Sequence, residues 1–255
     1  MQIKVLGCSG GIGQGARTSA LLVDEDVLLD AGTGVGDLSL PELRKIRHVL
    51  LTHAHLDHIA GLPFLIDSVF DARLGDPLTV YGRRETLATL QKHIFNWEIW
   101  PDFAQLPDLS NPVIKYQTLQ PGEVVDINRR LFHAVDVRHS VPAQGYCVSG
   151  PDGVFAISGD TTTNATLWPL LNSFADLKVL VVEVSFPDEQ LALAEAAGHY
   201  TPRTLAADLT KLTHTPEIWL TAMKPGDEST ILRQVQDAVP SRPVQMLSTG
   251  NTLII

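Results

Sequence analysis

The 255-residue sequence contains only two cysteines, Cys8 and Cys147, so it lacks the disulfide framework of a small secreted domain. No apolar run reaches the roughly 18 residues of a membrane helix, and no apolar leader opens the chain. Basic residues are scarce too, and the net charge of −10 argues against a nucleic-acid partner because no basic stripe could meet the phosphates. We therefore expect a cytoplasmic protein with no membrane partner.

The composition is that of an ordinary globular protein, with 44% apolar and 19% charged residues. No repeat, low-complexity tract or linker interrupts the chain, and its length allows one large core. We expect a single α/β domain over residues 1–255.

A helical and aromatic segment is expected at about residues 84–110. Its first turns, from Arg84 to Leu90, have the spacing of an amphipathic helix, and Trp97, Trp100 and Phe103 follow. Three roles stay open for these aromatic side chains: packing in the core, contact in a homodimer, and stacking on a nucleotide base.

The run VLGCSGGIG at residues 5–13 has the glycines of a dinucleotide-binding turn. Such a turn leads directly into a helix whose N-terminus meets the phosphates. Here two β-rich runs follow instead, residues 18–23 and 27–32, separated by a polar turn, which predicts a hairpin. We therefore interpret the glycine run as a tight turn beside a cleft, with Asp30 at the end of the second strand pointing toward that cleft.

A dense group of histidines follows the strand-like residues 49–52. Three imidazoles and one carboxylate lie within the six residues His53-Ala54-His55-Leu56-Asp57-His58, and residues 59–66 then predict the start of a helix. Imidazole and carboxylate suit zinc, iron and manganese, and crowding four such groups is favourable chiefly when cations neutralise and order them. The sequence therefore predicts a metal site here.

The pattern His-x-His-x-Asp-His after an apolar strand resembles the metallo-β-lactamase superfamily. The resemblance implies an α/β fold, a four-layer αβ/βα sandwich of two mixed β-sheets flanked by helices, with a metal site at the sheet edge. It also implies ligands at later strand ends, where the sequence places His139 and Asp160. The implied metal ligands are His53, His55 and His139 for one ion, Asp57 and His58 for a second, and Asp160 as a bridge, with Asp30 orienting a ligand.

One metal ligand of the superfamily pattern is absent from this sequence. The superfamily closes its second site with a late histidine in a Thr-His-x-Lys-Pro context, whereas here Thr221 is followed by Ala222, Met223, Lys224 and Pro225. Three outcomes stay open: a weak second site, a mononuclear enzyme, or an impaired catalyst. We therefore expect one or two divalent metal ions, zinc first, with manganese and iron as alternatives.

Several stretches resemble the class II cyclic-nucleotide phosphodiesterases of this superfamily. They are residues 53–62, 78–82, 94–103, 182–187 and 198–202, although residues 63–68 depart from the class signature. The resemblance implies hydrolysis of a 3′,5′-cyclic nucleotide, cyclic AMP foremost, to the 5′-monophosphate, with a small molecule as partner. The implied catalytic residues are Asp57, Glu183 and His199, with His199 as general acid and Glu183 orienting it.

Two alternatives remain. Residues 183 and 199 also lie in contexts like those of tRNA 3′-processing endonucleases, although the acidic net charge opposes RNA binding. A nucleotide-binding relative that has lost catalysis through Ala222 would fit as well.

Overall fold

The computed structural model describes residues 1–255. The strands of the chain form two seven-stranded sheets. The strands of the first sheet are β1 (Gln2–Gly7), β2 (Ala20–Val23), β3 (Val27–Leu29), β4 (His48–Leu50), β5 (Leu78–Gly82), β6 (Ile114–Thr118) and β14 (Thr252–Ile254). The strands of the second are β7 (Val124–Ile127), β8 (Arg130–Val137), β9 (Ala143–Gly150), β10 (Gly153–Ile157), β11 (Leu177–Glu183), β12 (Glu217–Thr221) and β13 (Val244–Met246).

Both sheets are mixed. The first has the order β14-β1-β2-β3-β4-β5-β6, with antiparallel pairing from β14 to β3 and parallel pairing from β3 to β6. The second has the order β13-β12-β11-β10-β9-β8-β7, with parallel pairing from β13 to β10 and antiparallel pairing from β10 to β7. Because parallel neighbours end at the same sheet edge, the loops after β10, β11 and β12 lie together.

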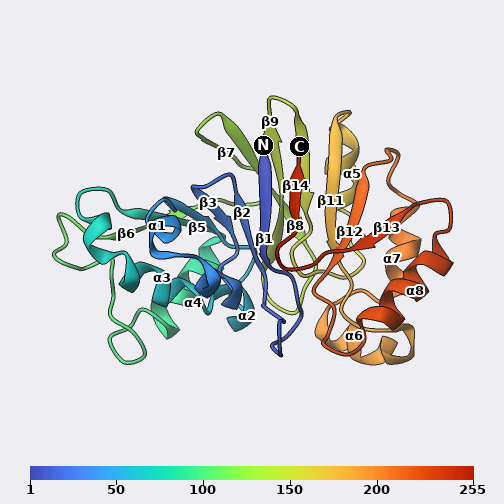
Figure 1. Cartoon of the computed structure of the whole chain (residues 1–255), viewed down its shortest axis with the longest axis horizontal. Coiled ribbons are helices and arrows are strands. Elements are labelled where there is room, and N and C mark those ends of the chain that lie inside the picture. The colour runs from blue at the N-terminus through green and yellow to red at the C-terminus, as the bar shows by residue number, and fades with distance from the viewer.

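Helices cover the outer face of each sheet (Figure 1). The helices beside the first sheet are η1 (Thr33–Asp37), α1 (Leu40–Leu43), α2 (Leu56–Ile59), α3 (Leu62–Ser68), η2 (Phe70–Arg73) and α4 (Arg84–His93). Those beside the second sheet are α5 (Leu167–Ser173), η3 (Asp188–Gln190), α6 (Leu191–Ala197), α7 (Pro202–Leu209) and α8 (Glu228–Ala238). The layers are therefore helix, sheet, sheet and helix, which confirms the predicted αβ/βα fold. None of the helices has the length and apolar character needed to traverse a bilayer.

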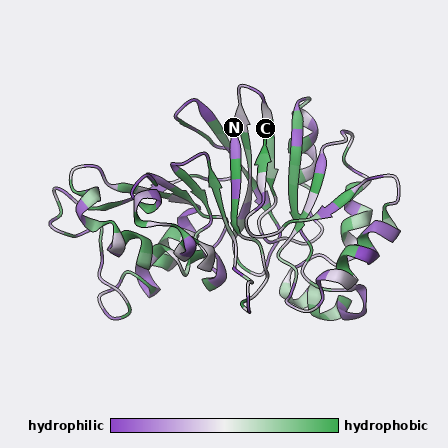
Figure 2. Cartoon of the chain, viewed as in Figure 1, coloured by the Kyte–Doolittle hydropathy of each residue, from purple (hydrophilic) through white to green (hydrophobic).

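The core consists of three apolar layers that the strand alternation explains. In β11, Val179 and Val181 face the layer between the two sheets, whereas Leu180 and Val182 face the helices. Successive side chains of a strand point to opposite faces, so a strand covered on both faces is apolar throughout. Figure 2 accordingly shows β11 as largely hydrophobic.

The local predictions have mixed outcomes. The hairpin is confirmed, because β2 and β3 pair antiparallel with Leu21 opposite Leu29, and no helix follows the glycine turn. The helix expected from Arg84 is confirmed as α4. The helix start predicted at residue 59 is wrong by three residues: α2 begins at Leu56, so Asp57 and His58 lie on a helical turn.

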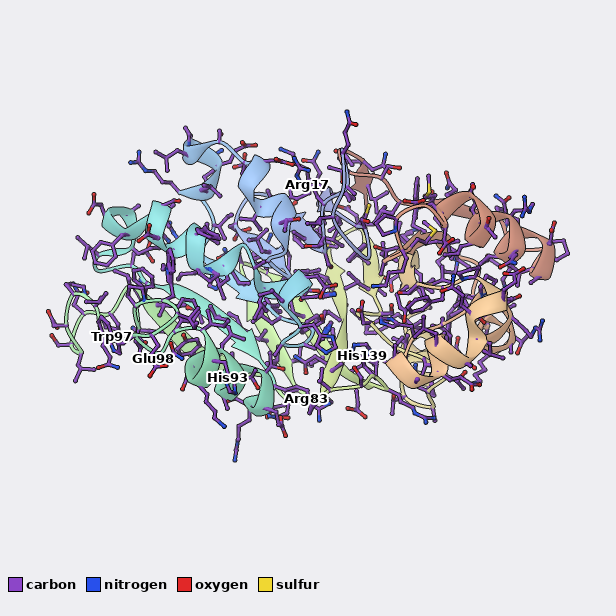
Figure 3. All side chains as sticks on the ribbon, turned by 90° about the horizontal axis from the view of Figure 1, so that it is seen from below. Arg17, Arg83, His93, Trp97, Glu98 and His139 are labelled. Atoms are coloured by element: carbon purple, nitrogen blue, oxygen red, sulfur yellow. The ribbon has the colours of Figure 1, made fainter.

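The aromatic side chains after α4 differ in their surroundings. Phe103 is buried in the core on the first sheet, and Trp100 packs edge-on against Phe64 with ring centroids 5.3 Å apart. Trp97 is 58% exposed, and Figure 3 shows it well apart from His139. Core packing therefore explains Trp100 and Phe103, and the arrangement gives no support to base stacking by Trp97.

Candidate metal centre

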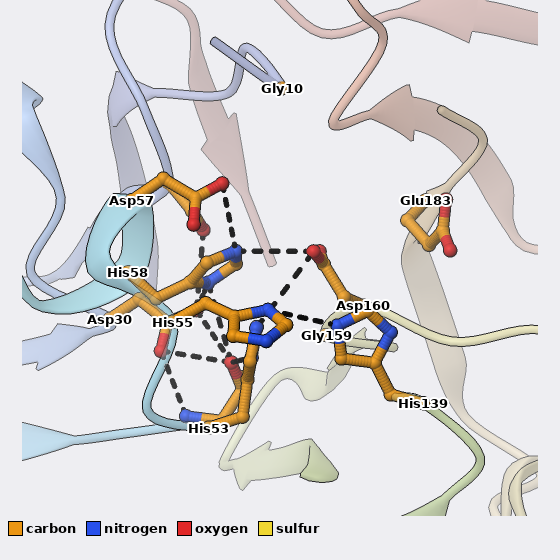
Figure 4. Close-up of polar contacts among 12 residues, drawn as sticks. Gly10, Asp30, His53, His55, Asp57, His58, His139, Gly159, Asp160 and Glu183 are labelled. Atoms are coloured by element: carbon orange, nitrogen blue, oxygen red, sulfur yellow. Dashed lines mark hydrogen bonds and ion pairs between the residues drawn. The ribbon is translucent and has the colours of Figure 1, made fainter. Parts of the chain in front are cut away.

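Five of the six predicted ligands converge at one edge of the sandwich (Figure 4). They form two groups whose ligand atoms lie within 4.8 Å of one another: His53, His55 and His139, and His53, His58 and Asp160. The first two histidines follow β4, His58 lies on α2, and the other two residues follow β8 and β10. The sixth, Asp57, stands outside these groups, with its carboxylate 3.9 Å from Nε2 of His58.

Asp30 lies beneath this cluster and is completely buried. Its carboxylate accepts hydrogen bonds from His58 Nδ1 at 2.6 Å and from the backbone nitrogen of Thr52 at 2.8 Å. The Thr52 hydroxyl also donates to Asp30, at 2.9 Å. With Nδ1 of His58 held in this way, its Nε2 faces the Asp160 carboxylate, 3.4 Å away. Asp30 thus fixes the orientation of the His58 imidazole, and its role behind a metal ligand stays a prediction.

The remaining imidazoles are in the form that binds metal. Burial lowers the pKa of His53, His55 and His139, so all three are neutral. His139 donates from Nδ1 to the carbonyl of Gly198 at 2.9 Å, which leaves the lone pair of Nε2 facing His55 Nδ1 at 3.1 Å. Nε2 of His53 is buried without any hydrogen-bond partner. A divalent cation would satisfy all of these nitrogens, so the residues fit a metal.

Negative charge inside the cluster also favours a cation. Burial alone would raise the pKa of Asp160, but the adjacent His58 and His53 hold it well below its usual range. For His58, burial would lower the pKa, and the carboxylates of Asp160 and Asp30 outweigh this and raise it well above its ordinary value. A metal ion could replace the His58 proton as the charge that balances these carboxylates.

Glu183 and His199 form a buried pair beside the cluster. Nδ1 of His199 lies 3.1 Å from a Glu183 carboxylate oxygen and 3.1 Å from the Ser185 hydroxyl, which in turn donates to Glu183 at 3.1 Å. Burial would lower the pKa of His199, but the Glu183 carboxylate outweighs this and raises it above its ordinary value. His199 also joins His139 and Asp160 in a third group with ligand atoms within 4.8 Å.

Ala222 lies at the end of β12, directly after the residue that pairs with Glu183. It is buried and has a left-handed backbone with φ of 62°. The backbone of the glycine turn packs directly against Ala222. A Cβ added to Gly10 would lie only 2.2 Å from the Ala222 carbonyl oxygen, so no larger residue fits there. Figure 4 shows Gly10 above the cluster of candidate ligands, on the glycine turn. The ammonium group of Lys224 stabilises this turn by donating a hydrogen bond to the Gly10 carbonyl at 2.8 Å.

The sequence interpretation missed the hydroxyl residues that orient these side chains. Thr52 links Asp30 to Nδ1 of His53, 3.0 Å from its hydroxyl. Ser185 joins Glu183 to His199. In the sequence, these two residues stand out only because they lie within two positions of a predicted site residue. Serine and threonine occur near such residues too often for this to indicate a role.

Comparison with known proteins identifies the family. A family model described as "Beta-lactamase superfamily domain" matches residues 25–221. A 3′,5′-cyclic-nucleotide phosphodiesterase of Aliivibrio fischeri is 30% identical in an alignment that covers 81% of this chain and 74% of that protein. A ribonuclease Z of Bradyrhizobium diazoefficiens is 25% identical in an alignment that covers 80% of this chain and 84% of that protein.

Solved structures agree on the fold. The crystal structure of unliganded yeast PDE1 superposes with a TM-score of 0.82 at 20% identity, covering 100% of this chain and 99% of that one. A short-form human tRNase Z superposes with a TM-score of 0.72 at 18% identity, covering 100% and 99%. The chain therefore belongs to the metallo-β-lactamase superfamily, and within it is similar to the class II cyclic-nucleotide phosphodiesterases.

Proposed function

We propose that this protein is a metal-dependent phosphodiesterase that opens the 3′,5′ ring of a cyclic nucleotide, cyclic AMP foremost, to give the 5′-monophosphate. The observation that carries the proposal is the placement of the Glu183–His199 pair directly beside His139 and Asp160 of the ligand cluster. A candidate proton donor therefore lies directly beside the candidate metal centre. The name of the relative from Aliivibrio fischeri supports the substrate class.

One or two divalent ions, zinc first and manganese or iron as alternatives, would be held by the predicted ligands. His53, His55 and His139 would hold one ion, Asp57 and His58 the other, with Asp160 shared. When bound, such ions supply a nucleophile at neutral pH and a Lewis acid for the phosphoryl oxygens.

The chain's own residues supply the proton that the reaction needs. Ring opening joins the oxygen of water to phosphorus and breaks the bond from phosphorus to the ribose 3′ oxygen, which must then take up a proton. Glu183 accepts the Nδ1 hydrogen of His199 and stabilises the imidazolium form, in which Nε2 carries the proton to be donated. Glu183 is itself fixed by the backbone N–H groups of Thr161, at 3.0 Å, and Tyr200, at 3.2 Å.

Two observations favour competing functions. The likeness to ribonuclease Z supports a tRNA-processing activity, which the net charge of −10 opposes. Ala222 supports a nucleotide-binding relative with impaired catalysis, because no imidazole follows β12 where the superfamily pattern has one.

The test is a substrate panel with metal-supplemented protein: cyclic AMP, cyclic GMP and a precursor tRNA. We expect conversion of cyclic AMP to 5′-AMP and no cleavage of the tRNA. The Ala222→His variant is assayed in parallel. Turnover restored only in that variant would favour an impaired relative, and cleavage of the precursor tRNA alone would overturn the proposal.

A further inference from the structure

Behind the Glu183–His199 pair lies a second buried carboxylate, Asp208 on α7, which is 2% exposed. One of its oxygens accepts hydrogen bonds from the Tyr200 hydroxyl at 2.6 Å and from the Trp168 indole nitrogen at 3.0 Å. The other accepts from Lys211 at 2.6 Å. A carboxylate this deep in the protein is stable only because these donors replace water, so its position is tightly determined.

Two chains of hydrogen bonds lead from Asp208 to Glu183. The first passes through Tyr200, whose hydroxyl donates to Asp208 and whose backbone nitrogen donates to Glu183 at 3.2 Å. The second passes through Asn164. Its backbone nitrogen donates to Asp208 at 3.3 Å, and its amide donates to the hydroxyl of Thr161 at 3.2 Å. The backbone nitrogen of Thr161 then donates to Glu183 at 3.0 Å.

These chains hold the two loops that carry the reacting groups. Tyr200 directly follows His199, and Thr161 directly follows Asp160. Asp208 therefore ties the loop of the proton donor to the loop of the shared metal ligand. Tyr200 is completely buried, and burial together with Asp208 raises the pKa of its phenol, so it stays a hydrogen-bond donor.

We infer that Asp208 and Tyr200 are positioning residues that set the place of Glu183 and His199 relative to Asp160. The inference rests on the proposed role of His199 as general acid. Neither residue is exposed to a substrate, so both act through the pair. An error of about 1 Å in such a group is enough to slow a reaction strongly.

The test uses Tyr200→Phe, which removes only the hydroxyl that donates to Asp208. Tyr116→Phe is the matched control, because the Tyr116 hydroxyl is also buried but has no hydrogen-bond partner. For cyclic AMP, we expect Tyr200→Phe to lower kcat about tenfold, with KM within about twofold. Hydrolysis of bis(p-nitrophenyl) phosphate should be unchanged, since p-nitrophenolate leaves without needing a proton. Tyr116→Phe should match the unaltered protein on both substrates.

A second measurement does not depend on turnover. The Nδ1 proton of His199, held by Glu183, should give a slowly exchanging downfield proton resonance, assigned by its loss in His199→Gln. We expect Tyr200→Phe and Asp208→Asn to shift or broaden it and Tyr116→Phe to leave it in place. An unchanged resonance in both variants would overturn the inference. A shifted resonance in a protein that does not hydrolyse cyclic AMP would support the positioning role and reject the proposed function.

Discussion

Replacing Asp30 by Asn should weaken metal binding without touching any metal ligand. The Asp30 carboxylate accepts from His58 Nδ1 at 2.6 Å, from the Thr52 nitrogen at 2.8 Å and from the Ser19 hydroxyl at 3.3 Å. An asparagine side chain has one acceptor oxygen and an NH₂ group, so it turns a donor toward at least one of these donors. The imidazole of His58 then loses its fixed orientation.

The size of the effect follows from these contacts. Loss of a hydrogen bond to a charged group costs ~1.5–3 kcal/mol, and loss of a partner behind a metal ligand lowers metal affinity about 10–100-fold. The two estimates agree, because each tenfold change in affinity corresponds to about 1.4 kcal/mol. We therefore expect the Kd for zinc to rise about 10–100-fold, measured on metal-stripped protein by competition with a fluorescent chelator.

Asp37→Asn is the matched control, because Asp37 is exposed and pairs only with Arg17. It should bind zinc like the unaltered protein. An Asp30→Asn variant with native circular dichroism and a zinc Kd within about twofold of the unaltered protein would refute the role assigned to Asp30.

Three further predictions concern the backbone and the thiols. Ala222→Gly should raise the free energy of unfolding by ~1 kcal/mol in urea titrations, because Ala222 has φ of 62°. Gly198→Ala should lower it by ~2 kcal/mol or more, since φ is 76° and a Cβ would lie 2.8 Å from the Ser140 nitrogen. Burial raises the pKa of Cys8 to about 11 and of Cys147 to about 12, so iodoacetamide at pH 8 should alkylate neither until the protein unfolds, as mass spectrometry would show.

The ligand cluster could be predicted from the sequence because its signal is local. His53, His55 and His58 stand within six residues at a strand end, and no structural role explains such crowding. The position of α2 could not be predicted in the same way. It spans only four residues and its first residue, Leu56, is 67% exposed, so no apolar periodicity marks its start.

The supporting contacts are set by tertiary packing. Asp208 looks in the sequence like any polar residue of an amphipathic helix, and its burial follows only from the packing of α5 and α7 around Trp168 and Tyr200. Nothing near Lys224 in the sequence indicates a partner, whereas the structure shows it donating a hydrogen bond to the carbonyl of Gly10. Both side chains find partners far away in the sequence, which local patterns do not encode.

The most direct test of the proposed function is the product formed from cyclic AMP by chelator-treated protein before and after zinc or manganese is added back. We predict no turnover without metal and release of 5′-AMP once metal is restored. Absence of turnover by the metal-loaded protein and by its Ala222→His variant alike would contradict the assignment of cyclic nucleotides as substrates.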